Sequence, residues 1–222
     1  SKYNVQTPDT LVEKFGADTL RCYEMFLGPL EQHKPWDIQG ITGVEGFLKK
    51  LWRLFHENNK LYVSDQEPTK EELKAIHKAI KKTQEDLERY SFNTPVSIFM
   101  ICVNELSALK CNKKAILSDL CLIISPYAPH ICEELWQKLG NKESISFAKF
   151  PKYNPKHLVE NSHKYPVSFN GKMRFILELP VNISKEETVK EVLKNEKTLK
   201  YLEGKTPKKI IVVPRKIVNI VL

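Results

Sequence analysis

The stretch GVEGFLKKLWRLFHEN, residues 43–58, carries the strongest helical signal in the sequence. Its apolar side chains recur at spacings of three and four residues, which places them on one face of an α-helix. We therefore predict an amphipathic helix that buries this face against other helices. The face consists of Val44, Phe47, Leu48, Leu51, Leu54 and Phe55.

Helix-start signals predict further helices on both sides of this stretch. Thr69 and Glu72 form a capping box, in which each side chain accepts a hydrogen bond from a free backbone N–H. The helix that begins there is expected to reach about residue 90. Because short loops favour antiparallel neighbours, we expect residues 41–140 to form an antiparallel helical bundle. The other predicted helices cover residues 8–15, 18–26, 94–110, 113–125 and 127–139.

After residue 166 the apolar period changes from that of a helix to that of a strand. Asn170-Gly171 lies between alternating apolar residues and predicts a β-hairpin, because both residues tolerate positive φ. A second capping box, Ser184 to Glu187, begins a helix that is expected to end near residue 204. Residues 210–213 and 217–222 predict two more strands.

These elements predict a mainly α protein in which the bundle is followed by a small ββαββ domain at residues 166–222. Residues 141–165 are rich in proline and polar residues and are predicted to be a connector, with one short strand near residues 145–147.

The net charge of the 222-residue chain is +8, and the excess lies entirely in its last third. Residues 1–150 hold 20 Lys/Arg and 20 Asp/Glu, whereas residues 151–222 hold 15 and 7. This asymmetry favours a polyanion as the partner of the last third. A hydrophobic content of 41% excludes a disordered chain, and no apolar run reaches the ~18 residues that a membrane span needs.

The sequence contains no motif that marks a complete catalytic or metal site. It lacks a phosphate-binding glycine loop, a nucleophile elbow and metal-ligand histidine spacings. The five cysteines form no C-x-x-C pair, so we expect reduced, buried thiols in a cytoplasmic protein. His130 follows Pro129 at a predicted helix start, where a structural, hydrogen-bonded histidine is favoured over a general base.

The basic residues of the last domain are the candidate ligand-binding residues. Lysines of the predicted helix 185–203 fit a solvated face as well as a binding face. The turns and the loop before the third strand instead suggest a surface that contacts phosphates, which gives affinity and position without reading sequence. The candidate RNA-binding residues are Lys172, Arg174, Lys205, Lys208, Lys209, Arg215 and Lys216.

Three stretches resemble class I aminoacyl-tRNA synthetases. Ser1-Lys2 with Asn4-Val5 and Gly16-Ala-Asp-Thr-Leu-Arg21 is similar to the end of the K-M-S-K-S loop and the helix behind it. Pro126-Tyr-Ala-Pro-His130 with Glu133-Glu-Leu-Trp136 looks like the late bundle helix of the leucine, isoleucine and valine enzymes. Phe169-Asn-Gly-Lys-Met-Arg174 and the segments 202–206, 209–214 and 218–221 resemble the end of a bacterial-type leucyl-tRNA synthetase.

The resemblance implies a C-terminal fragment of a cytoplasmic leucine–tRNA ligase. Residues 1–40 would be a remnant of the catalytic-domain hinge and residues 41–140 an anticodon-binding bundle. Ser1 and Lys2 would be all that remains of the ATP loop. The catalytic and editing domains would lie upstream, so the fragment should be inactive and need no cofactor, whereas the parent enzyme uses ATP and Mg²⁺. Structural roles are implied for Asp18 and Arg21, as an ion pair, and for Trp36, His130 and Trp136.

The partners implied by the resemblance are tRNA(Leu) and the upstream catalytic domain, in a monomeric enzyme without membrane contact. Two alternatives remain open. One is the corresponding part of a valyl- or isoleucyl-tRNA synthetase, which a coiled coil or a zinc module at the C-terminus would support. The other is a helical protein-interaction module with a basic RNA-binding tail.

Overall fold

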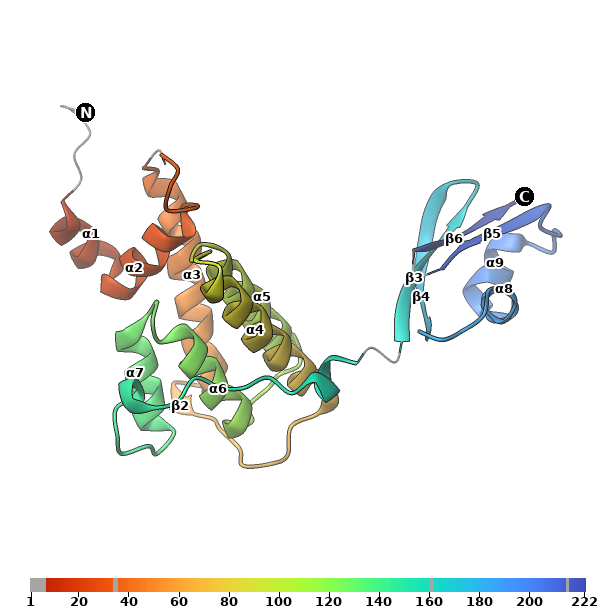
Figure 1. Ribbon diagram of the computed structural model, residues 1–222. Helices are drawn as coiled ribbons and strands as arrows, with labels where there is room; N and C mark the ends of the chain where they lie inside the picture. The colour runs from red at the N-terminus through yellow and green to blue at the C-terminus, as the bar shows by residue number, and fades with distance from the viewer. Residues whose placement is uncertain (1–6, 34–35, 160–161, 215) are drawn as a thin grey trace. The chain divides into compact units, whose positions relative to one another are not determined.

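The chain folds into two compact units, residues 1–158 and 159–222, which we call the helical unit and the C-terminal unit. The computed structural model describes residues 7–33, 36–159, 162–214 and 216–222. Helices dominate the first unit and a four-stranded sheet the second (Figure 1). The prediction of a mainly α protein is confirmed. None of the helices within these described ranges is both long and apolar enough to cross a membrane.

The helices of the first unit surround one continuous core. Phe55 and Phe99 are its largest fully buried side chains, and all five cysteines of the chain are buried in it. The predicted capping box forms, because Thr69 Oγ1 accepts from Glu72 N and Glu72 accepts from Thr69 N. The elements are α1 (Pro8–Phe15), α2 (Ala17–Phe26), α3 (Ile38–Phe55), α4 (Lys70–Glu88), α5 (Thr94–Ala108), α6 (Lys114–Ile124) and α7 (Pro129–Lys138), with the short strands β1 (His56–Glu57) and β2 (Lys60–Leu61).

Two predictions in this unit are wrong in detail. Helix α3 begins at Ile38 rather than near residue 43, because Asp37 accepts from Gln39 N and caps the helix five residues earlier. The predicted strand at residues 145–147 is a 3₁₀ turn, η1 (Ile145–Phe147). Glu133 Oε2 accepts the Ile145 N–H, which ties the segment to α7 instead of to a sheet. A second 3₁₀ turn, η2 (Pro155–Leu158), packs on α4.

In the C-terminal unit two helices cover one face of a sheet with the strand order β4-β3-β6-β5 (Figure 1). Strands β3 and β6 are parallel, and the other neighbours are antiparallel. The side chains under the helices form the second core, which includes Val167, Val192 and Val218. The elements are β3 (Ser162–Phe169), β4 (Lys172–Pro180), α8 (Lys185–Lys194), α9 (Glu196–Leu202), β5 (Lys209–Val213) and β6 (Ile217–Val221).

Strand β3 and the helical segment differ from their predictions. β3 begins at Ser162, within the stretch 141–165 that the proline pattern predicts as connector, since Pro166 is accommodated inside the strand. The predicted single helix is divided at Asn195, whose backbone is extended and whose side chain accepts from Lys197 N. Asparagine competes with the helix in this way because its short side chain can cap the next turn.

The hairpin turn at Asn170-Gly171 provides a small, local prediction. Both residues have positive φ, 48° and 81°, and a Cβ added to Gly171 would meet no atom within 4 Å. The Gly171→Ala substitution therefore costs only backbone strain, about 1 kcal/mol of unfolding free energy. Urea denaturation compared with the wild-type chain measures it. A loss of less than a few tenths of a kcal/mol would show that alanine adopts this backbone conformation without strain.

Candidate nucleic-acid interface

Three hydrogen bonds to residues 219–222 hold the tip of the β3–β4 hairpin. Asn170 N donates to Ile220 O at 2.9 Å, and Gly171 N donates to Asn219 Oδ1 at 3.0 Å. Asn170 Oδ1 in turn accepts from Leu222 N at 3.0 Å. The turn and the end of β6 therefore form one connected edge, which we call the hairpin end of the sheet.

Three of the predicted RNA-binding lysines border the hairpin end. Lys172 directly follows the turn as the first residue of β4. Lys208 N donates to Val221 O at 2.8 Å, and Lys208 Nζ donates to Leu222 O at 3.2 Å. Lys209 pairs with Val221 across the sheet. All three side chains are exposed. The topology brings them to the same end of the sheet, with Lys172 on one outer strand and Lys208 and Lys209 at the other.

Arg174 is held on the side of the sheet that carries the helices. The register of β3 and β4 passes from Phe175 to Met173 and leaves Arg174 in a bulge. Its guanidinium lies 5.5 Å from the centre of the Tyr201 ring, which packs at 5.3 Å from Phe169. A cation stacked on a ring keeps its orientation, and its N–H groups stay able to reach a phosphate.

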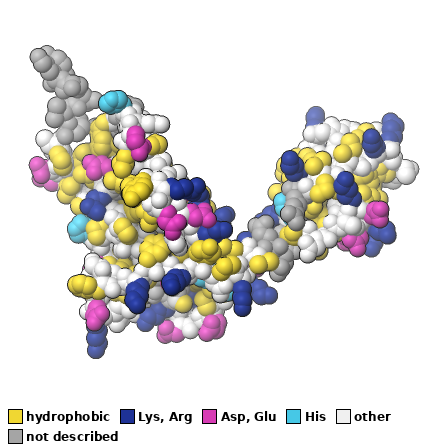
Figure 2. Space-filling view, in the orientation of Figure 1, with side chains coloured by type: hydrophobic (Ala, Val, Ile, Leu, Met, Phe, Trp, Pro, Cys, Tyr) yellow, Lys and Arg dark blue, Asp and Glu magenta, His cyan; other side chains and the backbone are white. Residues whose placement is uncertain are grey.

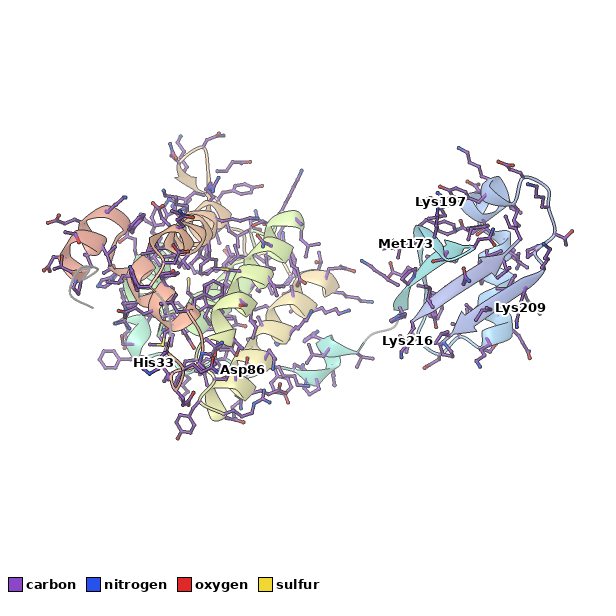
Figure 3. The ribbon with its side chains drawn as sticks, turned by 90° about the horizontal axis from the view of Figure 1, so that it is seen from above. His33, Asp86, Met173, Lys197, Lys209 and Lys216 are labelled. Carbon is purple, nitrogen blue, oxygen red and sulfur yellow. The ribbon has the colours of Figure 1, made fainter. Side chains whose placement is uncertain are left out.

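The other predicted residues do not all join this group. Lys216 lies in the turn between β5 and β6, where its N–H donates to Val213 O at 3.1 Å. Since β5 runs from Lys209 to Val213, Lys216 lies at the opposite end of the sheet from Lys209 (Figure 3). Lys205 is exposed in the loop between α9 and β5. Arg215, Ser1 and Lys2 lie outside the described residues.

The basic residues of this unit are largely without acidic partners. Within residues 162–214 and 216–222, no ion pair involves Lys172, Arg174 or the lysines at 205, 208, 209 and 216. The pair that does form there joins Lys194 to Glu191 at 3.6 Å on α8. Figure 2 shows basic side chains at several separate places on the visible face of the unit. A polyanion could therefore approach these cations without displacing a carboxylate.

The sheet face without helices exposes apolar side chains, which the sequence pattern did not reveal. The strand register brings Met173, Ser168, Asn219 and Ile211 into one row across the four strands. Ile176 and Val213 belong to the next row. Met173 is 58% exposed and Ile176 52%. Lys209 lies on the same face, so this apolar surface borders the basic hairpin end.

The helical unit contains a basic groove that the charge count missed. Its volume is about 600 Å³, and it lies between the end of α3, the β1–β2 hairpin and the end of α5. Lys50 Nζ donates to Asn104 Oδ1, and Arg53 Nε donates to Lys49 O. Because residues 1–150 balance in charge overall, only their position in space reveals a basic groove. Its lining includes the cations Lys50, Arg53 and Lys110, one acid, Glu57, and the rings of His56 and Tyr62.

Asp18 and Arg21, for which an ion pair is implied, take different partners. The Asp18 carboxylate accepts from Ile131 N at 2.7 Å, from His130 N at 3.2 Å and from His130 Nδ1 at 2.8 Å. Arg21 Nη2 donates to Pro126 O at 3.0 Å. Helix α2 is thereby attached to the segment that begins α7.

The two tryptophans assigned structural roles pack or bond locally. The Trp36 ring meets that of Tyr23 edge to face, with centroids 5.2 Å apart, and the Tyr23 hydroxyl donates to Asp37 O. Trp136 Nε1 donates to Glu143 O at 3.0 Å, which fixes the chain after α7. Both contacts connect a helix to the loop beside it.

The thiols of this unit are unsuited to nucleophilic chemistry. Burial raises the pKa of Cys22 to about 12, and the charge of Asp18 adds to the effect. Burial likewise raises the pKa of Cys111 to about 12. Across the described ranges, no three His, Cys, Asp or Glu side chains gather in a way that could hold a metal ion. The arrangement offers exposed cations and a basic groove, which are features of a binding surface.

Comparison with known proteins identifies the family. The family model described as "Anticodon-binding domain of tRNA ligase" matches residues 70–191. The leucine–tRNA ligase of Christiangramia forsetii is 61% identical over the whole of this chain, which spans 23% of that protein. The enzyme of Cytophaga hutchinsonii is 59% identical, and this chain spans 24% of it.

A solved structure shows the same likeness. The crystal structure of a ternary complex of Agrobacterium radiobacter LeuRS, tRNA and LeuAMS matches 98% of this chain and 30% of that one, with a TM-score of 0.64 and 28% identity. The chain therefore belongs to the family of anticodon-binding domains of tRNA ligases, and its full-length similarity is to the leucine–tRNA ligases.

Proposed function

We propose that this chain is the tRNA-binding region of a leucine–tRNA ligase, which holds tRNA(Leu) while other parts of the enzyme attach leucine to it. The observation that carries the proposal is the hairpin end of the sheet, which is bordered on both outer strands by exposed lysines without acidic partners. The similarity to leucine enzymes over the full chain favours leucine over valine or isoleucine.

In this proposal the helical unit and the C-terminal unit have different roles in binding tRNA. The helical unit is an antiparallel bundle of the anticodon-binding type, joined to a catalytic domain of the same polypeptide in a monomeric enzyme. Residues 1–40 belong to the hinge of that domain, and the residues after 141 connect the bundle to the C-terminal domain, whose first strand begins at Ser162. ATP and Mg²⁺ act in the catalytic domain.

The chemistry of the hairpin end suits RNA recognised by shape. Lysine ammonium groups contact phosphates as point charges, and the Arg174 guanidinium presents several N–H donors in one plane. Contacts of this kind neutralise the RNA backbone and release counterions, so the affinity falls as salt rises. They do not read bases, and structured RNA is typically recognised through its backbone. The basic groove of the helical unit supplies a further surface of the same chemistry.

Neutralising the hairpin end tests the proposal. The test variant replaces three lysines of the hairpin end together: Lys172→Gln, Lys208→Gln and Lys209→Gln. We expect this triple variant of the 222-residue chain to bind tRNA(Leu) about tenfold or more weakly near 0.15 M salt. The plot of log affinity against log salt has a negative slope, and its magnitude should decrease by about 2. Each lost phosphate contact removes roughly 0.7 to 0.9 from that magnitude. Valine tRNA should lose affinity similarly, because the contacts are to the backbone. Filter binding at several salt concentrations measures both quantities.

The matched control carries the same charge change on the helix face. Lys185, Lys190 and Lys194→Gln should change affinity less than about threefold, since α8 would be a solvated face. Equal losses in both triple variants would show a general charge effect instead of a binding surface. Unchanged binding in the hairpin-end variant would remove this surface from the interface. A third triple variant, with Lys50, Arg53 and Lys110 all replaced by Gln, shows in the same assay whether the groove of the helical unit contributes to tRNA affinity.

A further inference from the structure

Two histidines from distant parts of the helical unit stack on each other. His77 lies on α4 and His157 in η2, and their ring centroids are 4.6 Å apart with planes inclined by only 8°. Parallel stacking at this distance suits two neutral rings. Two imidazolium ions in the same position would repel each other, because their charges would lie within a few ångströms.

The stack is part of a small set of contacts that hold residues 153–158 on α4. Asn154 N donates to His77 Nδ1 at 3.2 Å. Lys81 Nζ lies 5.8 Å from the centre of the Tyr153 ring. A ring nitrogen can accept this bond only while it carries no proton. The neutral form of His77 is therefore required both for the stack and for the hydrogen bond.

The surroundings of His77 also disfavour its charged form. Burial lowers the pKa of His77, and the charge of His157 lowers it further. Lys74 and Lys81 lie one turn away on α4, and Lys156 precedes His157 in the chain. Helices α5 and α6 also pack on α4. Their charged residues are Glu105 on α5 and Lys114 and Asp119 on α6, and none of these three shifts the pKa of His77.

We propose that the His77–His157 stack is a pH-sensitive clasp, closed when both rings are neutral and opened when His77 takes up a proton. Protonation removes the acceptor for Asn154 N and places like charges face to face. The sign follows from linkage: the clasp is fully stabilised above the ordinary histidine pKa and is lost as the pH falls through the lower pKa of the closed state. This inference does not depend on the proposed RNA binding.

The clasp holds the last segment of the helical unit, so its opening would release that segment from α4. Residues 153–158 are the last part of the helical unit, and the C-terminal unit begins at residue 159. Released from α4, these six residues could extend over up to roughly 20 Å, at about 3.3–3.6 Å per extended residue. A drop in pH thus frees from α4 the last segment of the helical unit, which leads into the C-terminal unit.

Hydrogen exchange and NMR on the 222-residue chain test the proposal. Ring-proton titration should give His77 a midpoint below the ordinary histidine value. His33, an exposed loop histidine, serves as the control residue (Figure 3). As the pH falls through the His77 midpoint, the protection factor of the Asn154 amide, corrected for intrinsic exchange, should drop at least fivefold. The amides of α4 should keep their protection, which shows that the unit remains folded. A constant Asn154 protection factor through the titration would overturn the proposal.

Two substitutions separate the charge from the contact. His77→Asn places an amide oxygen near the position of Nδ1, so Asn154 protection should lose its pH dependence even where closure is weaker. His157→Phe keeps a flat ring in the stack and removes the second charge, so the His77 midpoint should rise. The control, His33→Asn, should leave the pH dependence of Asn154 unchanged. Persistence of that dependence in His77→Asn would assign it to another group.

Discussion

The Asp18→Ala variant should lose about 3 kcal/mol of unfolding free energy, which corresponds to a fall in Tm of roughly 6–12 °C. The Asp18 side chain is largely buried, and its carboxylate accepts three hydrogen bonds from the start of α7. Two of the donors, His130 N and Ile131 N, belong to the first turn of α7, where the helix itself offers no acceptor. Alanine leaves these donors without a partner, and a hydrogen bond to a charged acceptor contributes about 1.5–3 kcal/mol.

Urea denaturation followed by far-ultraviolet circular dichroism measures this loss. Asp18→Asn keeps one oxygen as an acceptor and should lose about half as much. The control is Asp9→Ala, an exposed acid in the first turn of α1, which should change stability by less than about 0.5 kcal/mol. If Asp18→Ala is as stable as Asp9→Ala, the link between α2 and α7 contributes little to folding.

The Asp86→Asn variant should lose about 2–3 kcal/mol of unfolding free energy at neutral pH, which is the second large effect that we expect. The residue is 3% exposed at the end of α4 (labelled in Figure 3). Oδ1 accepts from Lys82 Nζ and from Arg89 Nη2, each at 2.9 Å, and Oδ2 accepts from the Thr94 hydroxyl. The carboxylate therefore joins the end of α4 to the start of α5, and an amide cannot accept at both positions.

The same contacts make the effect depend on pH. Burial alone would raise the pKa of Asp86, but the hydrogen bonds from Thr94, Lys82 and Arg89 outweigh it and hold the pKa below its ordinary value. The carboxylate therefore stabilises the fold fully above the unfolded pKa, and this contribution disappears as the pH falls through the lower folded value. The difference in unfolding free energy between the wild type and Asp86→Asn should shrink as the pH falls below about 5 and through the lowered folded pKa.

A neighbouring residue provides the control for this prediction. Glu85 lies on the exposed side of α4, 3.8 Å from Lys81, and Glu85→Gln should be within about 0.5 kcal/mol of the wild type at every pH. Urea titrations at several pH values compare the three proteins. A constant difference between the wild type and Asp86→Asn would show that the folded pKa is not displaced.

Signals confined to a few neighbouring residues predicted their elements well. Both capping boxes form as expected, since Thr69 with Glu72 and Ser184 with Glu187 complete their bonds within one helical turn. The Asn170-Gly171 turn has the positive φ values that its residue types favour. In each case the interacting groups lie three residues apart or fewer, so no distant contact is needed to select the conformation.

Predictions failed where a distant partner decided the outcome. The apolar residues at 145–147 could form a strand or a turn, and Glu133 from α7 selects the turn by accepting the Ile145 N–H. The sequence pattern likewise treats the lysines of the last third as one group. The order β4-β3-β6-β5 instead brings Lys172 and Lys209 to one end of the sheet and Lys216 to the other.

By itself the amino-acid sequence determined the helix starts, the hairpin turn and the concentration of positive charge in the last third, because these depend on neighbouring residues or on composition. Only the tertiary structure decided which cations share one end of the sheet, that Asp18 caps α7, and that Lys50 and Lys110 line one groove. The physical reason is range: a cap or a turn is completed within one turn of chain, whereas a binding surface is assembled by packing residues that lie tens of positions apart.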